Sequence, residues 1–173
     1  MDRHNQKGVG LVEVLVALVI LALGVLGFAA LQLRALDAAQ EATEQTVAMS
    51  TARDLAERMR INRGALGHYK TAINSKSTVN NCMGTTKITS PKALALPKCN
   101  EENFAKQDAG EVLAKATNNG QMVVIHDCVA SELNCIYVAW GKTVISANDL
   151  SECIDTTTGA YIVNSKCLVM EAF

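Results

Sequence analysis

Hydrophobic and polar residues divide the chain into a strongly apolar first third and a mixed remainder. After a polar leader, residues 1–8, no charged residue occurs from Val14 to Leu33. Twenty such residues in a helix are long enough to cross a membrane. Helix-forming residues without Gly or Pro continue from Ala35 to Asn62. Apolar positions recur there at helical spacing and predict a face that packs on a folded head: Val47, Ala48, Thr51, Ala52, Leu55, Ala56 and Met59.

These patterns predict four segments. They are the leader 1–8, a membrane-spanning helix 9–34, its amphipathic continuation 35–64 and a globular head 65–173. Gly24 and Gly27 interrupt the apolar helix, where they mark either a soft spot or a site of close helix packing. Two i, i+4 ion pairs are expected on the wet side of the continuation, Arg53 with Glu57 and Asp54 with Arg58.

The head alternates between turn-rich and regular patterns, and its fold class is predicted as α+β. Residues 67–96 are polar and turn-rich and predict a loop. A short helix is expected at Glu101–Ala116, with Asn100 as its N-cap. Its apolar positions are Phe104, Val112, Leu113 and Ala116. Strands are expected at 121–128, 134–140 (with Trp140 in the core), 161–163 and 167–170, the first two joined as a hairpin.

Six cysteines lie in the head and none in the first 81 residues: Cys82, Cys99, Cys128, Cys135, Cys153 and Cys167. An even count in a small domain behind a membrane segment favours disulfides formed in an oxidising compartment. Zinc is less favoured, because no C-x-x-C pair occurs and the three histidines are scattered. Fifteen pairings are possible. We favour the sequential one, Cys82–Cys99, Cys128–Cys135 and Cys153–Cys167.

Charge and motifs argue against several classes of function. The net charge is −1, and the head after residue 66 holds nine Lys/Arg and ten Asp/Glu. There is no strong nucleic-acid signal, although a local basic patch could exist. No catalytic or phosphate-binding motif is present. Asp149, Glu152 and Asp155 read as a solvated acidic turn rather than a calcium site, and His126 as a packed or exposed strand residue. We expect no enzyme activity, cofactor or metal.

Glu13 is the one charge at the mouth of the apolar run, and such a charge is costly in lipid. It is either a boundary residue that reaches the interface or a carboxylate with a partner. A cut after Gly8 would supply a partner, because the new α-amine of Val9 lies four residues away. In an assembly of parallel helices, the partner could be a neighbour's amine. Opposite charges attract strongly in an apolar bundle, so the pair would set axial register.

The stretch Lys7-Gly8-Val9-Gly10-Leu11-Val12-Glu13-Val14 resembles the class III signal of type IV prepilins and of type II secretion pseudopilins. The resemblance implies cleavage between Gly8 and Val9 by a prepilin peptidase and N-methylation of Val9. It also implies an assembly role for Glu13. The sequence departs from the usual pattern at Val9, where phenylalanine is common, and at Gly10, where Thr or Ser is common.

Two longer stretches, Glu13–Gly24 and Asp54–Asn62, resemble PilV-type minor pilins, also called type IV pilus modification proteins. That family implies a lollipop fold, with a long N-terminal helix packed on a small antiparallel sheet. It implies a priming or tip complex with other minor pilins, the major pilin and a tip adhesin, supporting adhesion and twitching motility. Before assembly the chain would cross the inner membrane once, with its N-terminus in the cytoplasm and its head in the periplasm. It would then join the extracellular pilus at its tip.

Three alternatives stay open. The first is a type II secretion pseudopilin, which has the same N-terminal signal and apolar helix. The second is a pilin whose head binds a surface ligand or DNA. The third is a signal-anchored periplasmic protein with no assembly role.

Overall fold

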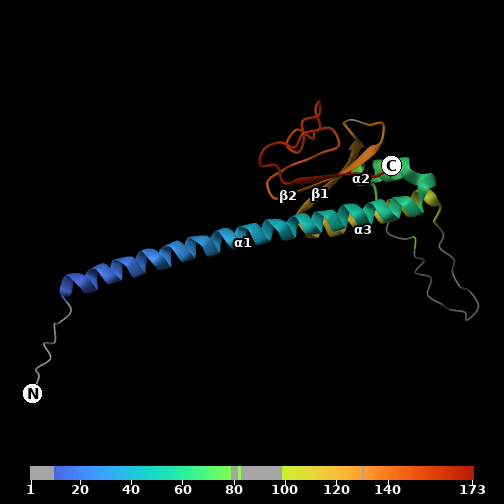
Figure 1. The fold of residues 1–173 in the computed structure, drawn as a ribbon. Helices are drawn as coiled ribbons and strands as arrows, with labels where there is room; N and C mark the ends of the chain where they lie inside the picture. The colour runs from blue at the N-terminus through green and yellow to red at the C-terminus, as the bar shows by residue number, and fades with distance from the viewer. Residues whose placement is uncertain (1–9, 79–81, 83–98, 130) are drawn as a thin grey trace, which may run out of the picture. The chain divides into compact units, whose positions relative to one another are not determined.

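The computed structural model describes residues 10–78, 82, 99–129 and 131–173 (Figure 1). It has the predicted α+β class, a long N-terminal helix together with a small antiparallel sheet. The elements in chain order are α1 (Leu11–Ile61), the 3₁₀ turn η1 (Arg63–Ala65), α2 (Leu66–Ser75), α3 (Glu101–Asn118), β1 (Gln121–Asp127), β2 (Asn134–Trp140) and β3 (Cys167–Glu171). Two compact units divide the chain, Met1–Thr43 and Glu44–Phe173, and α1 contributes to both.

The second part of α1 buries the face that its spacing predicts. Its buried residues are Ala48, Thr51, Ala52, Leu55 and Met59. The four apolar residues among them join residues of α2, α3 and the sheet in the larger of two hydrophobic clusters. Thr51 is the polar member of this face, and its hydroxyl donates to Gln121 Oε1 in β1 at 2.9 Å. A buried hydroxyl with a partner avoids a desolvation cost of about 1–3 kcal/mol.

The sheet has the order β1-β2-β3 and is antiparallel throughout. The first two strands form the predicted hairpin, with Gln121 opposite Trp140 and Asp127 opposite Asn134. Side chains alternate between faces, so Ile136, Val138 and Trp140 join the larger cluster, which confirms Trp140 as a core residue. Cys135, Tyr137 and Ala139 belong to a second cluster, to which the loop between β2 and β3 contributes four buried residues: Ile145, Leu150, Cys153 and Ile154. The central strand is therefore buried on both faces.

The predicted loop is wrong in its first part, because residues 66–75 form helix α2. Tyr69, Ala72 and Ile73 are buried and share one helical face. The segment was predicted as a loop because most of its other residues are polar or glycine. The helix ends where Lys76 adopts a left-handed conformation, φ 54°. Of the remaining predicted loop, 79–81 and 83–96 lie outside the described residues.

The prediction of a strand at residues 161–163 is wrong. Tyr161 makes one isolated bridge with Ile154, and Val163 is 86% exposed. Asn164 then turns the chain at φ 64°. An apolar triplet is too short to specify a strand when only one of its residues pairs with a neighbour.

Helix α3 begins at the predicted residue and runs two residues past the predicted end. Asn100 is its N-cap, as predicted, since its side chain accepts from the Asn103 amide at 2.9 Å. Val112 and Ala116 are buried as expected, but Phe104 is 43% exposed. The face is instead completed by three residues not predicted as core: Ala105, Asp108 and Ala109.

Candidate assembly surface

Glu13 lies in the first turn of α1. The helix begins at Leu11, and the Glu13 amide donates to the Gly10 carbonyl at 2.9 Å. The exposed amides at a helix N-terminus carry positive partial charge, so a carboxylate is favourable in this turn. Gly8 and Val9 lie outside the described residues. Cleavage, N-methylation and the register role of Glu13 therefore stay predictions.

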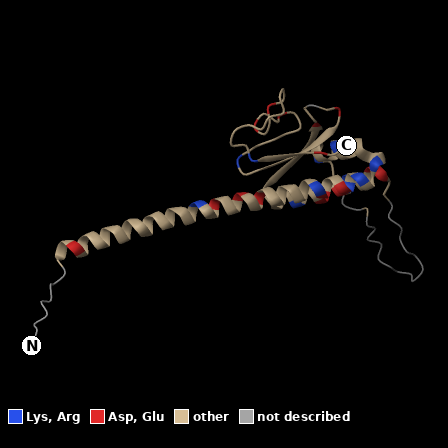
Figure 2. Ribbon diagram, in the orientation of Figure 1, with Lys and Arg blue, Asp and Glu red and all other residues tan. Residues whose placement is uncertain are grey.

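The apolar part of α1 carries its side chains outward. Every large hydrophobic residue from Leu11 to Leu33 is at least 48% exposed. Mean hydropathy in this helix reaches 3.0. By length and composition, the helix is long and apolar enough to cross a membrane. Figure 2 shows the charges of α1 gathered along its second part, with its first part almost uncharged. Exposed apolar surface on this scale calls for lipid or partner helices around it.

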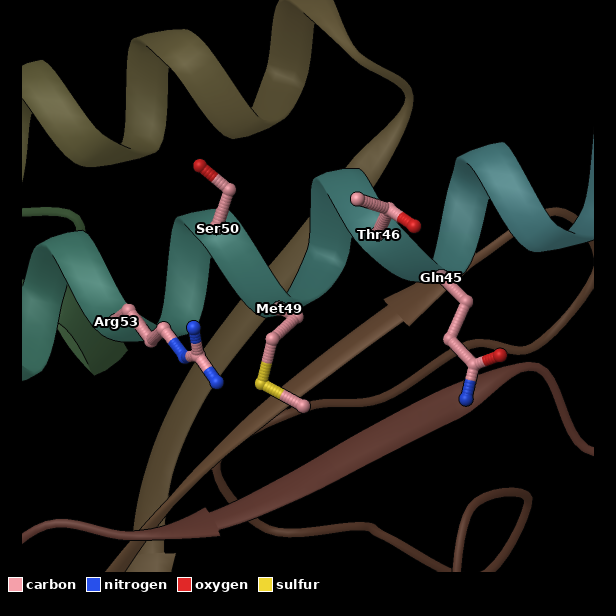
Figure 3. Close-up of a pocket in the computed structure, with 5 residues that line it drawn as sticks. All are labelled: Gln45, Thr46, Met49, Ser50 and Arg53. Carbon is pink, nitrogen blue, oxygen red and sulfur yellow. The ribbon is translucent and has the colours of Figure 1, made fainter.

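A polar stripe follows on the second part of α1. Gln45, Thr46, Met49, Ser50 and Arg53 line a hollow of about 450 Å³. Figure 3 shows Gln45 and Met49 pointing to the same side of the helix and Ser50 to the opposite side. Among the five residues that line it, no nucleophile lies beside a general base.

A group of ionic contacts, here named the Arg58 clamp, fixes α1 to its neighbours. The Arg58 guanidinium donates to Asp54 on its own helix at 2.9 Å, and to Asp108 and Glu111 on α3 at 2.7 and 2.8 Å. Tyr69 of α2 donates its hydroxyl to Asp108 at 2.5 Å. One guanidinium and one buried carboxylate thus connect three helices.

Burial and hydrogen bonding shift the ionisation of the clamp. Burial, reinforced by Asp108, raises the pKa of the Tyr69 phenol well above its usual value. Burial alone would raise the pKa of Asp54, but hydrogen bonds from Arg58 and Lys115 hold that pKa below its usual value. The predicted pair of Asp54 with Arg58 is confirmed, whereas Glu57 pairs with Arg60 instead of Arg53.

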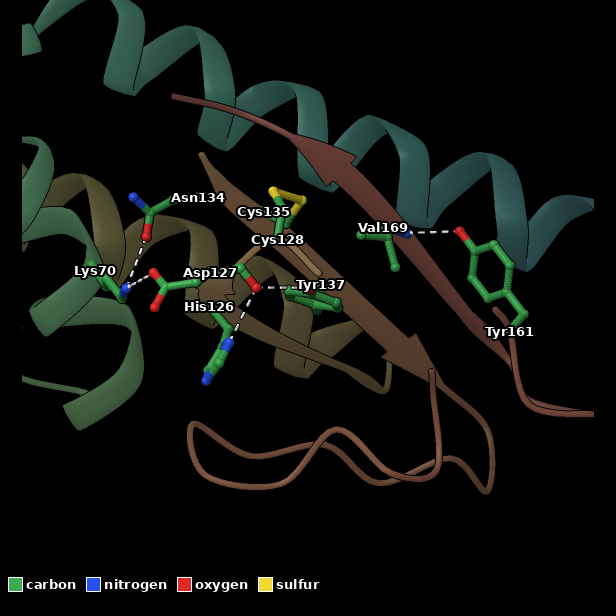
Figure 4. The surroundings of a disulfide bond; sticks show 9 residues. All are labelled: Lys70, His126, Asp127, Cys128, Asn134, Cys135, Tyr137, Tyr161 and Val169. Atoms are coloured by element: carbon green, nitrogen blue, oxygen red, sulfur yellow. Dashed lines mark hydrogen bonds and ion pairs between the residues drawn. A yellow bond between two sulfur atoms is a disulfide. The ribbon is translucent and has the colours of Figure 1, made fainter. Parts of the chain in front are cut away.

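Three disulfides close the head: Cys82–Cys99, Cys128–Cys135 and Cys153–Cys167. These are the sequential pairs that the sequence favours. The second closes the base of the β1–β2 hairpin, as Figure 4 shows. Beside it, Lys70 of α2 donates to Asp127 at 2.5 Å and to Asn134 at 2.8 Å, which joins α2 to both strands.

The acidic residues of the β2–β3 loop accept hydrogen bonds from backbone amides of the same loop. Asp149 accepts from the Ser151 amide, Glu152 from the Val144 amide and Asp155 from the Thr157 amide. Within the described residues, no group of three or more His, Cys, Asp or Glu could hold a metal ion. His126 is half-buried at the hairpin, with Nδ1 3.2 Å from the Asp127 carbonyl (Figure 4).

Sequence reasoning missed Asp108 and Tyr69, the buried members of the clamp. The available signal was helical spacing. Tyr69 lies one turn from Ala72 and Ile73, and Asp108 lies between Ala105 and Val112 on the core side of α3. An acidic residue at a core position predicts a partner, because an unpaired buried carboxylate is very costly.

Comparison with known families gives two adjoining matches. The model described as "Prokaryotic N-terminal methylation motif" matches residues 3–29. The model described as "Type IV pilin Tt1218" matches residues 30–110. No curated protein and no solved structure matches the chain. The first match covers Glu13 and most of the apolar helix. The second covers the rest of α1 and extends into α3, and it includes every residue of the Arg58 clamp except Glu111. The family is one of pilins and not of enzymes.

Proposed function

We propose that this chain, whose residues 3–110 match a type IV pilin and its methylation motif, is a minor pilin that helps to initiate pilus assembly. A prepilin peptidase cuts it between Gly8 and Val9 on the cytoplasmic side, and the new N-terminus of Val9 is methylated. The chain waits in the inner membrane with its head in the periplasm. It then enters a priming or tip complex with other minor pilins, the major pilin and a tip adhesin.

The observation that carries the proposal is the isolated charge of Glu13 on a helix that is otherwise apolar and exposed. A cut after Gly8 would place a new amine at Val9, four residues before this carboxylate in the sequence. In a bundle of such helices, the amine of an adjacent subunit could approach Glu13 instead. Either charge would be expensive if left alone in an apolar environment. A shift of one helix along its neighbour would break the pair, so the pair selects one register.

The resemblance to PilV-type minor pilins supports the finer assignment. The stretch Asp54–Asn62 that carries it includes Arg58, which binds α3. In the described structure, this stretch therefore holds the helix to the head. A subunit that joins an assembly through α1 and presents a rigid head to its partners fits a role in priming.

The test uses a host strain lacking this chain, complemented with wild type, Glu13→Ala or Asp37→Ala. Asp37 is the matched control, because it is exposed on the same helix beyond the apolar run. Mass spectrometry of the mature N-terminus is expected to find methylated Val9 in all three. Pilus counts by electron microscopy and blots of sheared filaments are expected to fall severalfold for Glu13→Ala and to stay normal for Asp37→Ala.

Other outcomes separate the alternatives. Normal pili with a loss of protein secretion would identify a type II pseudopilin. Normal assembly in the null strain, with loss of binding to a surface or to DNA, would identify a ligand-binding pilin. An uncut Met1, or a cut after Ala30, would remove the pilin role and leave a membrane-anchored periplasmic protein.

A further inference from the structure

A hollow of about 420 Å³ lies along the outer edge of β1. The ends of α2 and α3 and the β2–β3 loop form its walls, through residues such as Ile73, Leu113 and Ile145. Its size is in the range of ligand pockets. It lies wholly within the compact unit Glu44–Phe173.

Val123 lines this hollow, and its backbone N–H and C=O have no hydrogen-bond partner among the described residues. In an antiparallel pair, alternate residues bond to the partner strand and the rest point away. Cys128 bonds to Leu133 across the hairpin, so even-numbered residues of β1 bond to β2 and Val123 points outward. The side chain of Val123 is buried in the core, so this strand edge is reached through the hollow.

The next outward position, Ile125, shows how this edge is satisfied. Asn74 at the end of α2 donates from Nδ2 to the Ile125 carbonyl at 2.7 Å. Its Oδ1 accepts from the Ile125 amide at 3.0 Å. The Asn74 side-chain amide thereby makes the two hydrogen bonds that a residue of a neighbouring strand would make with Ile125. Val123 is two residues away, the spacing at which an added strand would make its next pair of bonds.

Charge indicates which segment fits. Lys76 is the one charged residue among the described residues that line the hollow, and no carboxylate lies there to neutralise it. The other walls are largely apolar. An occupant with alternating small apolar side chains and one carboxylate would match both features.

We propose that this hollow is a docking site for an extended segment of a partner protein, which adds to the free edge of β1 at Val123 and places a carboxylate against Lys76. Main-chain hydrogen bonds at Val123 provide the affinity, and the apolar walls with Lys76 provide the selectivity. The site belongs to the head and does not depend on the priming role.

The test titrates the full chain in detergent micelles, labelled with ¹⁵N-valine, with the peptide acetyl-Thr-Val-Thr-Val-Asp. The Val123 resonance is assigned from its loss in Val123→Ile. Two further peptides are N-methylated on alternate residues, so that each has one blocked backbone edge. Strand addition predicts that the Val123 amide shifts and exchanges its hydrogen at least about tenfold more slowly. One methylated peptide should lose binding and the other should keep it.

Charge variants complete the test. Lys76→Glu is expected to weaken peptide binding roughly two- to fivefold, the range of an exposed ion pair. Arg63→Glu changes the charge equally and should leave binding unaltered. It lies before α2, about 15 Å of helix from Lys76.

Four results would overturn the proposal. The first is a Val123 amide that does not respond up to about 1 mM peptide. The second is equal binding by both methylated peptides, which indicates apolar contact without strand addition. The third is a response confined to the β3 edge at Val169. The fourth is protection of Val123 that grows with protein concentration without peptide, which identifies a second copy of the chain as the occupant.

Discussion

Removal of the Asp108 carboxylate should show how much the Arg58 clamp contributes to the stability of the head. In Asp108→Ala, the Tyr69 hydroxyl and the Arg58 guanidinium each lose a charged acceptor, at 2.5 and 2.7 Å. The Asp108 side chain is only 10% exposed. A hydrogen bond to a charged group contributes about 1.5–3 kcal/mol.

The remaining contacts reduce this loss. Arg58 keeps Asp54 and Glu111, and its own side chain is 29% exposed. Tyr69 keeps the Arg58 carbonyl as a weaker acceptor at 3.3 Å. We therefore expect the free energy of unfolding to fall by about 2 kcal/mol, less than the ~3–5 kcal/mol for breaking a fully buried pair.

The assay is guanidinium unfolding in micelles, followed by the fluorescence of Trp140. This residue is the only tryptophan and lies in the larger core cluster, so it reports on the head alone. Glu111→Ala is the matched control. It accepts from the same Arg58 nitrogen but is 50% exposed, so its loss should cost only ~0.2–1 kcal/mol.

A double-mutant cycle isolates the buried contact. Tyr69→Phe combined with Asp108→Ala should destabilise by at least about 0.5 kcal/mol less than the sum of the two single changes. Equal losses for Glu111→Ala and Asp108→Ala, or additive losses in the cycle, would refute the reasoning that burial sets the strength of the clamp.

Three further predictions follow from the same head. Because the pKa of Tyr69 is raised on folding, the stability that its neutral phenol contributes is complete below about pH 10 and declines progressively as the pH rises above 10; unfolding at pH 9–11 should show stability falling in wild type and a shallower fall in Tyr69→Phe. Leu55→Ala removes a fully buried side chain from α1 and should cost about 3 kcal/mol in the Trp140 assay, and a loss below 1 kcal/mol would contradict its core position. Replacement of Cys153 and Cys167 by Ala should cost about 3 kcal/mol, with added reductant abolishing the difference from wild type.

Periodicity predicted the elements whose faces are clearly apolar. The packing face of α1, the β1–β2 hairpin and the cap of α3 follow from local rules that act within a few residues. The same rules failed where a polar residue serves the core. Tyr69 and Asp108 are acceptable in the interior because each satisfies the other, and a single residue's polarity does not reveal its partner.

The prediction of a strand at 161–163 failed for a related reason. Its residues have high strand propensity, but propensity acts only when a neighbour offers a ladder. The chain around them is instead held by turns and by Tyr161, whose hydroxyl accepts from the Val169 amide at 3.2 Å. For the candidate site, the sequence was enough to single out Glu13 and the apolar helix, because Glu13 is a charged residue beside a long uncharged run. The outward edge at Val123 depends on which residues of β1 face β2, and that register is a tertiary property.

The three disulfides also allow the head to be crosslinked independently of α1. They join cysteines 17, 7 and 14 residues apart, and all six cysteines lie beyond α1. Contacts of such low sequence separation form early, because little loop entropy is lost in closing them. Each crosslink can therefore form before α1 has docked. The covalent bonds lie within the head, and α1 is attached to it by reversible contacts alone.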